Sequence, residues 1–219
     1  MNLNNKKLVA MGVLVILTLI IYISCIKSPY TIDTPWEYPI AITDSDFWAK
    51  LQEDHSIISI PEEICKQMTT EALLESCLAY PDLLGWRSHH AATNIFPEWV
   101  EYDIQFAELF SREDFPKVMY KAYSKEQFYK IKPYETLNDN ERQKVDEHEE
   151  RLMYMELFMF QMELEADDNP YKTKLLKEID EKKQQKTEFG WPRQPSYYHW
   201  AMELKETSDR FKNHNYKTY

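Results

Sequence analysis

Two adjacent histidines, His89 and His90, are the residues of this chain whose type most suggests metal chemistry. Imidazole nitrogens bind transition metals, but a site needs three or four ligands that converge. Neighbouring side chains on a helix point in different directions, and no further ligand follows either histidine at a helical spacing. The H-E-x-x-H and Glu-x-x-His patterns are missing as well. We therefore expect an exposed polar loop here, no metal and no cofactor, with His89 and His90 as weak metal candidates.

Aromatic residues near the C-terminus, Trp191, Tyr197 and Trp200, suggest a different chemistry, the stacking of sugar rings. A glycan-binding module requires such rings to be exposed and coplanar. The same residues suit a structural role, because aromatic rings bury large areas when a terminal helix packs on a core. We expect packing, and we keep glycan stacking as an alternative that the exposure of these three rings decides.

Acidic residues are so numerous that no catalytic pair stands out among the 37 Asp and Glu. A glycoside hydrolase needs two carboxyl groups about 5–10 Å apart across a cleft. In the acidic run 146–151, Glu147 and Arg151 are four residues apart, a spacing typical of an ion pair on a solvated helix face. A hydrolase of unfamiliar type remains possible only where His89 or His90 meets carboxylates in a cleft.

Glycine spacing and net charge exclude or disfavour two further classes of function. After the first 27 residues the glycines are Gly85 and Gly190, so the closely spaced glycines of phosphate-binding loops are absent. The formal net charge of −11 argues against nucleic-acid binding, which needs a basic surface that displaces counterions from phosphates.

The first 27 residues predict export or membrane anchoring. Lys6 and Lys7 precede an uncharged apolar run over residues 8–26, and about 20 such residues cross a bilayer as a helix. Ser24-Cys25 resembles the end of a bacterial lipobox, which makes Cys25 a lipidation candidate, although Tyr22 replaces the usual aliphatic residue. An uncleaved anchor and an ordinary cleaved signal peptide are the other interpretations. All three deliver the rest of the chain outside the cytoplasm, bound to the cell membrane in the first two.

The two remaining cysteines, Cys65 and Cys77, lie among apolar residues on adjacent predicted helices. An exported location permits a disulfide between them. Free cysteine also behaves as a small buried hydrophobe. We expect buried thiols, with a disulfide as the alternative.

Helices must position these residues, because no segment shows the alternation and turn signals of strands. Capping signals predict helix starts at residues 43–46, at Pro61, at Thr69 or Thr70, at Asp114 and at Asn138. We expect an all-α fold with one irregular helical bundle over residues 43–211. An extended, proline-rich collar (28–42) precedes the bundle, and a polar tail (212–219) follows it.

Three predictions concern the faces of these helices. A helix over 98–110 should carry Val100, Ile104, Ala107 and Phe110 on one side. The long helix over 138–166 has two apolar stripes and should therefore be central. The charged helix that follows Pro170 should be exposed, and 196–211 should form the last helix.

The segment 60–81, IPEEICKQMTTEALLESCLAYP, resembles a motif of uncharacterised exported bacterial proteins. Residues 34–39 look like the entry segment of that family, and residues 112–123 fit its later part more loosely. The resemblance implies export and a helical fold. It implies no activity and no catalytic residues, because none is assigned to the family.

We therefore expect a membrane-tethered, extracytoplasmic helical protein that acts as a non-catalytic protein-interaction module of the cell envelope. Its expected partners are the membrane, through the N-terminus, and an envelope protein. A glycan remains possible, and a nucleic acid is not expected. The alternatives are a glycan-binding module and an unfamiliar hydrolase.

Overall fold

The computed structural model describes residues 30–39, 46–81, 103–164, 169–191, 195–203 and 205. Throughout these ranges the regular structure is helical, and the one β-bridge is isolated, between Ile32 and Met68. The all-α prediction is therefore confirmed. None of the helices in these ranges is both long and apolar enough to cross a membrane. The predicted span at residues 8–26 lies outside them, as does the tail.

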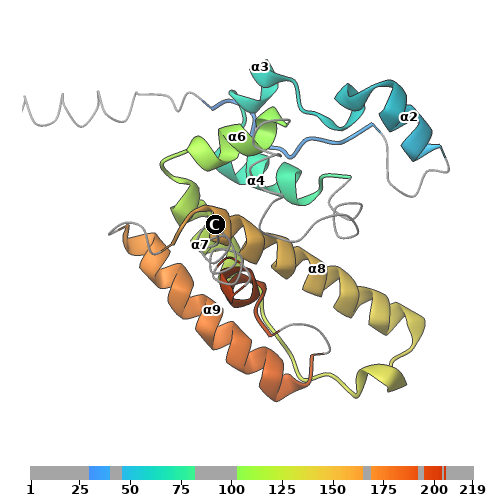
Figure 1. The fold of residues 1–219 in the computed structure, drawn as a ribbon, viewed down its shortest axis with the longest axis vertical. Coiled ribbons are helices and arrows are strands. Elements are labelled where there is room, and N and C mark those ends of the chain that lie inside the picture. The colour runs from blue at the N-terminus through green and yellow to red at the C-terminus, as the bar shows by residue number, and fades with distance from the viewer. Residues whose placement is uncertain are drawn as a thin grey trace, which may run out of the picture.

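Short helices form the upper part of the molecule in Figure 1, beginning where the sequence offers caps. They are α2 (Phe47–Glu53), η1 (His55–Ile58), α3 (Glu62–Cys65), α4 (Thr70–Leu78) and α6 (Ile104–Ser111). The Thr69 side chain accepts a hydrogen bond from the Ala72 N–H and so caps α4. The interior of this part is apolar and includes Phe47, Ile60, Leu73 and Phe106.

Residues 30–39 do not form a free collar but an arm that packs on α3 and α4. The Thr31 and Ile32 N–H groups donate to the Gln67 carbonyl at 2.7 and 3.0 Å, and Ile32 accepts from the Thr69 N–H at 2.7 Å. Farther along, the Trp36 N–H donates to Ser76 Oγ at 2.7 Å. The arm is extended as predicted, and three of its backbone N–H groups donate to acceptors on the helical domain.

Arg112 joins this arm to the helices beneath it. Its guanidinium donates to the carbonyls of Met68 and Cys65 at 2.6 and 2.7 Å, and it lies 4.2 Å from the ring centroid of Tyr30. Cys65 is the last residue of α3, and Met68 lies between α3 and α4. A buried arginine therefore binds the connection between α3 and α4 and holds the beginning of the arm.

The two longest helices among the described residues lie in the lower part of the molecule (Figure 1). The elements of this part are α7 (Phe115–Tyr123), η3 (Tyr134–Thr136), α8 (Asp139–Gln161) and α9 (Pro170–Phe189), followed by a last helix at residues 197–203. The predicted capping box of α8 is present, with Asn138 and Glu141 bonded reciprocally. Every residue from Leu152 to Met159 is buried, which confirms that α8 is central. The helix ends near Gln161, before a left-handed Glu163 with φ of 49°.

The apolar side predicted for α6 only partly faces the core: Phe110 packs against it, and Val100 lies outside the described residues. Ile104 is 40% exposed, whereas Gln105, Phe106 and Leu109 are buried. The Gln105 side chain accepts from the Ile60 N–H at 3.4 Å and so satisfies a buried backbone group. A polar side chain with such a partner can lie on the buried side of a helix. The pattern of apolar residues in the sequence therefore does not reveal that Gln105 is buried.

Candidate functional site

Charged side chains gather where α4, α7, α8 and α9 meet, and Arg151 on α8 is at the centre of this junction. Its two Nη atoms donate to the Glu75 carboxylate on α4 at 2.9 and 2.7 Å, and its Nε donates to Glu126 at 2.9 Å. Burial alone would lower the pKa of Arg151, but its hydrogen bonds with the two carboxylates outweigh burial and raise that pKa above its ordinary value. The pair expected between Arg151 and Glu147 is not formed, because Glu147 accepts from Gln143 instead.

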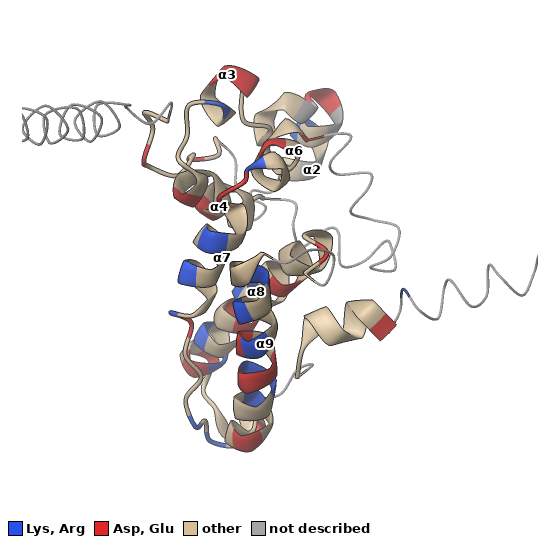
Figure 2. Ribbon diagram, turned by 90° about the vertical axis from the view of Figure 1, so that its left-hand side faces the viewer, with Lys and Arg blue, Asp and Glu red and all other residues tan. Residues whose placement is uncertain are grey.

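A cleft of about 330 Å³ opens above Arg151, between α4 and α7. The walls carry charges of both signs, with Glu71 on α4 facing Lys121 on α7 at 3.8 Å. The floor is apolar and includes Leu74 and Val118. Figure 2 shows the lysines of α7 and the mixture of charges on α8 and α9.

A buried ion pair links α8 to α9 below this cleft. Lys186 Nζ lies 2.9 Å from a Glu149 carboxylate oxygen, and the two side chains are 2% and 0% exposed. The ammonium group is also 5.4 Å from the ring centroid of Tyr197. The prediction of a solvated acidic run is thus wrong at Glu149, and the prediction of an exposed α9 is wrong at Lys186, because these two charges neutralise each other inside the protein.

Glu156, also on α8 and buried, holds the N-terminus of the last helix. One carboxylate oxygen accepts from the Tyr123 hydroxyl at 2.8 Å. The other accepts from Ser196 Oγ at 3.0 Å and from the N–H groups of Tyr197 and Tyr198 at 2.5 and 3.0 Å. A carboxylate is favoured at a helix N-terminus, where N–H groups lack helical acceptors. The role of Glu156 is therefore to position the last helix.

His148 and Lys182 complete the junction, and both are less basic than usual. Burial lowers the pKa of His148; Glu126 opposes that shift, while neighbouring cations including Lys182 and Arg151 add to it. The His148 Nε2 atom has no hydrogen-bond partner among the described residues. Burial likewise lowers the pKa of Lys182 against the opposing effect of nearby carboxylates, and its Nζ donates to the Glu126 carbonyl.

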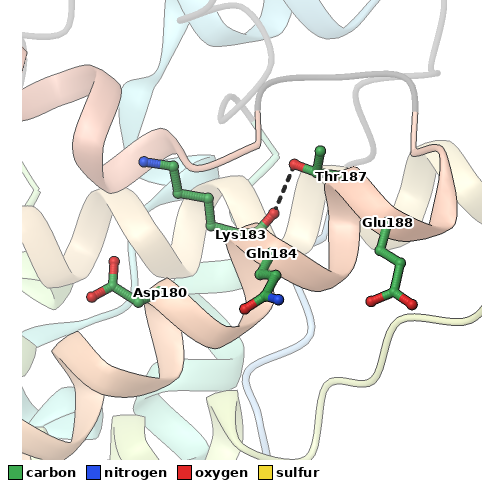
Figure 3. Close-up of a pocket in the computed structure, with 5 residues that line it drawn as sticks. All are labelled: Asp180, Lys183, Gln184, Thr187 and Glu188. Atoms are coloured by element: carbon green, nitrogen blue, oxygen red, sulfur yellow. Dashed lines mark hydrogen bonds between the residues drawn. The ribbon is translucent and has the colours of Figure 1, made fainter.

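A second hollow, of about 560 Å³, lies along the outer face of α9 (Figure 3). Its side chains, Asp180, Lys183, Gln184, Thr187 and Glu188, come from that single helix and are all exposed. The Thr187 hydroxyl bonds to the Lys183 carbonyl of its own helix at 3.0 Å. The last helix approaches at one point, where His199 Nε2 lies 3.3 Å from Asp180 Oδ1. The other lining groups come from α9 alone, so this hollow offers no cluster of converging groups.

The three rings considered as an alternative glycan-stacking site do not form one platform. Trp191 is 6% exposed, and its Nε1 donates to the Tyr129 carbonyl at 2.9 Å. Gly190, with φ of 76°, ends α9 in the left-handed conformation, after which an apolar residue commonly packs back on the helix. Tyr197 and Trp200 meet edge to face at 85°, with Trp200 36% exposed. Packing therefore accounts for Trp191, and the remaining two rings are not coplanar.

The metal and lipidation candidates, His89, His90 and Cys25, lie outside the described residues. Asp103 could act as a metal ligand with these histidines only if the fold brought it near them. It lies within the described residues and is buried. Its carboxylate accepts from the hydroxyls of Tyr80 and Ser59 at 2.8 and 3.0 Å. Within the described parts of the chain, no three His, Cys, Asp or Glu side chains are grouped so that they could hold a metal ion.

The two internal cysteines are free, buried thiols, as expected. Cys65 donates to the Ile60 carbonyl at 3.6 Å, and Cys77 donates to the Gln105 carbonyl at 3.7 Å. Burial raises the pKa of Cys65 to about 11 and raises that of Cys77 well above its ordinary value. The thiolate is the reactive form, so both side chains are chemically inert at neutral pH.

The junction could not be found from sequence, because its partners are far apart in the chain. Arg151 and Glu75 are separated by 76 residues, and Lys186 and Glu149 by 37. Comparisons with protein-family models, with curated proteins and with solved structures found no match to this chain.

Proposed function

We propose that this chain is a membrane-tethered, extracytoplasmic helical module that acts through protein–protein contacts in the cell envelope. The observation that carries the proposal is the docked arm. Its first described residue, Tyr30, follows four positions after the apolar run that ends at Ile26. Four peptide units span at most about 14 Å. A membrane-inserted run would therefore hold the helical domain next to the bilayer surface.

The internal bonding of the arm gives this tether a fixed direction. A long, free linker would let the domain rotate, whereas residues 31, 32 and 36 are hydrogen bonded to the helices. The stacking of Arg112 on Tyr30 fixes the arm at its beginning. Such an arrangement suits a protein that presents one surface to a neighbour in the same membrane.

The use of the buried charged groups supports a non-catalytic role. The Glu156 carboxylate accepts hydrogen bonds from Tyr123 and from the last helix, and Glu149 pairs with Lys186 between α8 and α9. These groups join helices. Glycan binding is the weaker alternative, because the burial of Trp191 removes one of its three rings.

The proposal is tested with the full chain expressed in a bacterium. We expect the protein in the membrane fraction, extracted by detergent but not by alkaline carbonate, and degraded by protease added outside the cytoplasmic membrane. Incorporation of a labelled fatty acid that the Cys25→Ala variant loses would identify a lipoprotein. Incorporation in neither form would favour the uncleaved anchor. Recovery in the soluble cytoplasmic fraction would contradict the proposal.

Photo-crosslinking in intact cells then addresses the partner. A photoreactive residue at exposed Glu135 in η3 or exposed Lys183 on α9 samples two surfaces of the lower part. We expect a crosslink of defined mass from at least one position. Crosslinks to lipid alone, or none from any exposed position scanned, would contradict the protein-interaction role and leave the tether unaffected.

A further inference from the structure

The cleft between α4 and α7 has walls of opposite charge. Glu71 and Glu75 are four residues apart on α4 and so lie on one face of that helix. Across the cleft, Lys121 lies in the last turn of α7, and Lys125 lies two residues beyond its end. The remaining carboxylate of that side, Glu126, is bound by Arg151 Nε, which leaves the two ammonium groups opposite the α4 carboxylates.

The end of the cleft is rigid because Arg151 binds Glu75 with both Nη atoms and Glu126 with Nε. Bidentate arginine–carboxylate pairs fix geometry as well as charge. The apolar floor includes Leu74 and Val118, which are 1% and 3% exposed. A ligand would thus meet a preformed surface with charged sides, closed beneath by Leu74 and Val118.

The rim, by contrast, is available for a ligand. The Glu71–Lys121 pair is long, at 3.8 Å, and both side chains are more than half exposed. Exposed pairs of this kind are weak and easily exchanged. Lys125 is exposed, and its ammonium group has no ion-pair partner among the described residues.

We infer that this cleft binds a small zwitterion, an amino acid or short peptide with free amino and carboxyl ends. The three carboxylates and three cations that line it would repel part of any ligand of a single charge sign. A zwitterion places its ammonium group against the α4 carboxylates and its carboxylate against the α7 lysines. The volume of about 330 Å³ lies at the lower end of ligand pockets, which suits a molecule of dipeptide size. This ligand goes beyond the proposed function and does not depend on the tether.

The test is calorimetric titration of the full chain in detergent micelles with alanyl-leucine as the probe. A ligand of its size that uses both ends binds with a dissociation constant of about 1 mM or tighter. N-acetyl-alanyl-leucine and alanyl-leucine amide each lack one charge and should bind about tenfold more weakly. Absence of binding, or blocked peptides that bind as tightly as alanyl-leucine itself, overturns the inference.

Rim variants locate the site. Glu71→Gln and Lys125→Met change exposed side chains and should each weaken alanyl-leucine binding about twofold to fivefold. Lys177→Met is the matched control, because Lys177 is an exposed lysine of α9 whose side chain is 78% accessible. Circular dichroism establishes that the three variants are folded. Equal affinity of both rim variants and the control would mean that the charges of the cleft only join helices, and it would overturn the inference.

Discussion

Replacing Lys186 with methionine tests whether the buried pair with Glu149 behaves as the structure requires. The two side chains are 2% and 0% exposed and their charged atoms are 2.9 Å apart. Removing one partner of such a pair leaves an uncompensated charge in a poorly solvated site, which costs about 3–5 kcal/mol. For a protein of this size, 1 kcal/mol corresponds to about 2–4 °C in melting temperature. We therefore expect Lys186→Met to lower the melting temperature by about 6–20 °C.

The same pair gives a second, opposite expectation for the double replacement. Glu149→Leu with Lys186→Met removes both charges and fills the space with apolar groups, which is commonly neutral or stabilising by about 1–4 kcal/mol. The double variant should therefore be more stable than either single variant.

The assay is thermal unfolding of the full chain in detergent, followed by circular dichroism. The control is Lys177→Met, which removes an exposed lysine paired with Glu181 on the same helix, and it should change the free energy of unfolding by less than about 0.5 kcal/mol. If Lys186→Met unfolds within 1 °C of this control, the pair is hydrated and the reasoning from burial is refuted.

Four further outcomes are expected. Glu156→Leu removes the acceptor of two helix N–H groups and should speed amide hydrogen exchange at residues 197–198 by about tenfold or more, with unchanged exchange in α4 as the control. The lowered pKa of His148 means that its neutral ring contributes stability above the ordinary value of 6.5, which is lost as the pH falls below it. His148→Phe should therefore flatten the stability profile between pH 7 and pH 5, and an unchanged slope would contradict this account. Because burial raises the pKa of Cys65 to about 11, Ellman's reagent should label this thiol only after unfolding. Arg112→Met should make the arm sensitive to limited proteolysis, whereas Tyr30→Phe, which keeps the aromatic ring, should not.

Local signals in the sequence predicted much of the fold. The Asn138 capping box and the Thr69 cap depend on residues three positions apart, so the pattern that forms them is visible in the chain itself. The two stripes of α8 predicted its central position, because a helix with apolar residues on most sides needs neighbours on most sides.

The charged junction could not be predicted, because its energetics depend on distant partners. Lys186 and Glu149 look like surface residues until α8 and α9 meet, and Arg151 had a plausible local partner in Glu147 that the structure replaces with Glu75. The packing expected for Trp191 is found. Its burial follows from the left-handed Gly190, which turns the chain back.

The position of Glu156 has a consequence for the order of assembly. Synthesis from the N-terminus completes Tyr123 and α8 before residues 196–198 exist, so one oxygen of this carboxylate can find its partner first and the other must wait. Until the last helix arrives, that oxygen needs water. The interior beside α8 therefore closes only when the C-terminal segment docks, and a chain interrupted before Ser196 would leave Glu156 open to solvent where the finished protein buries it.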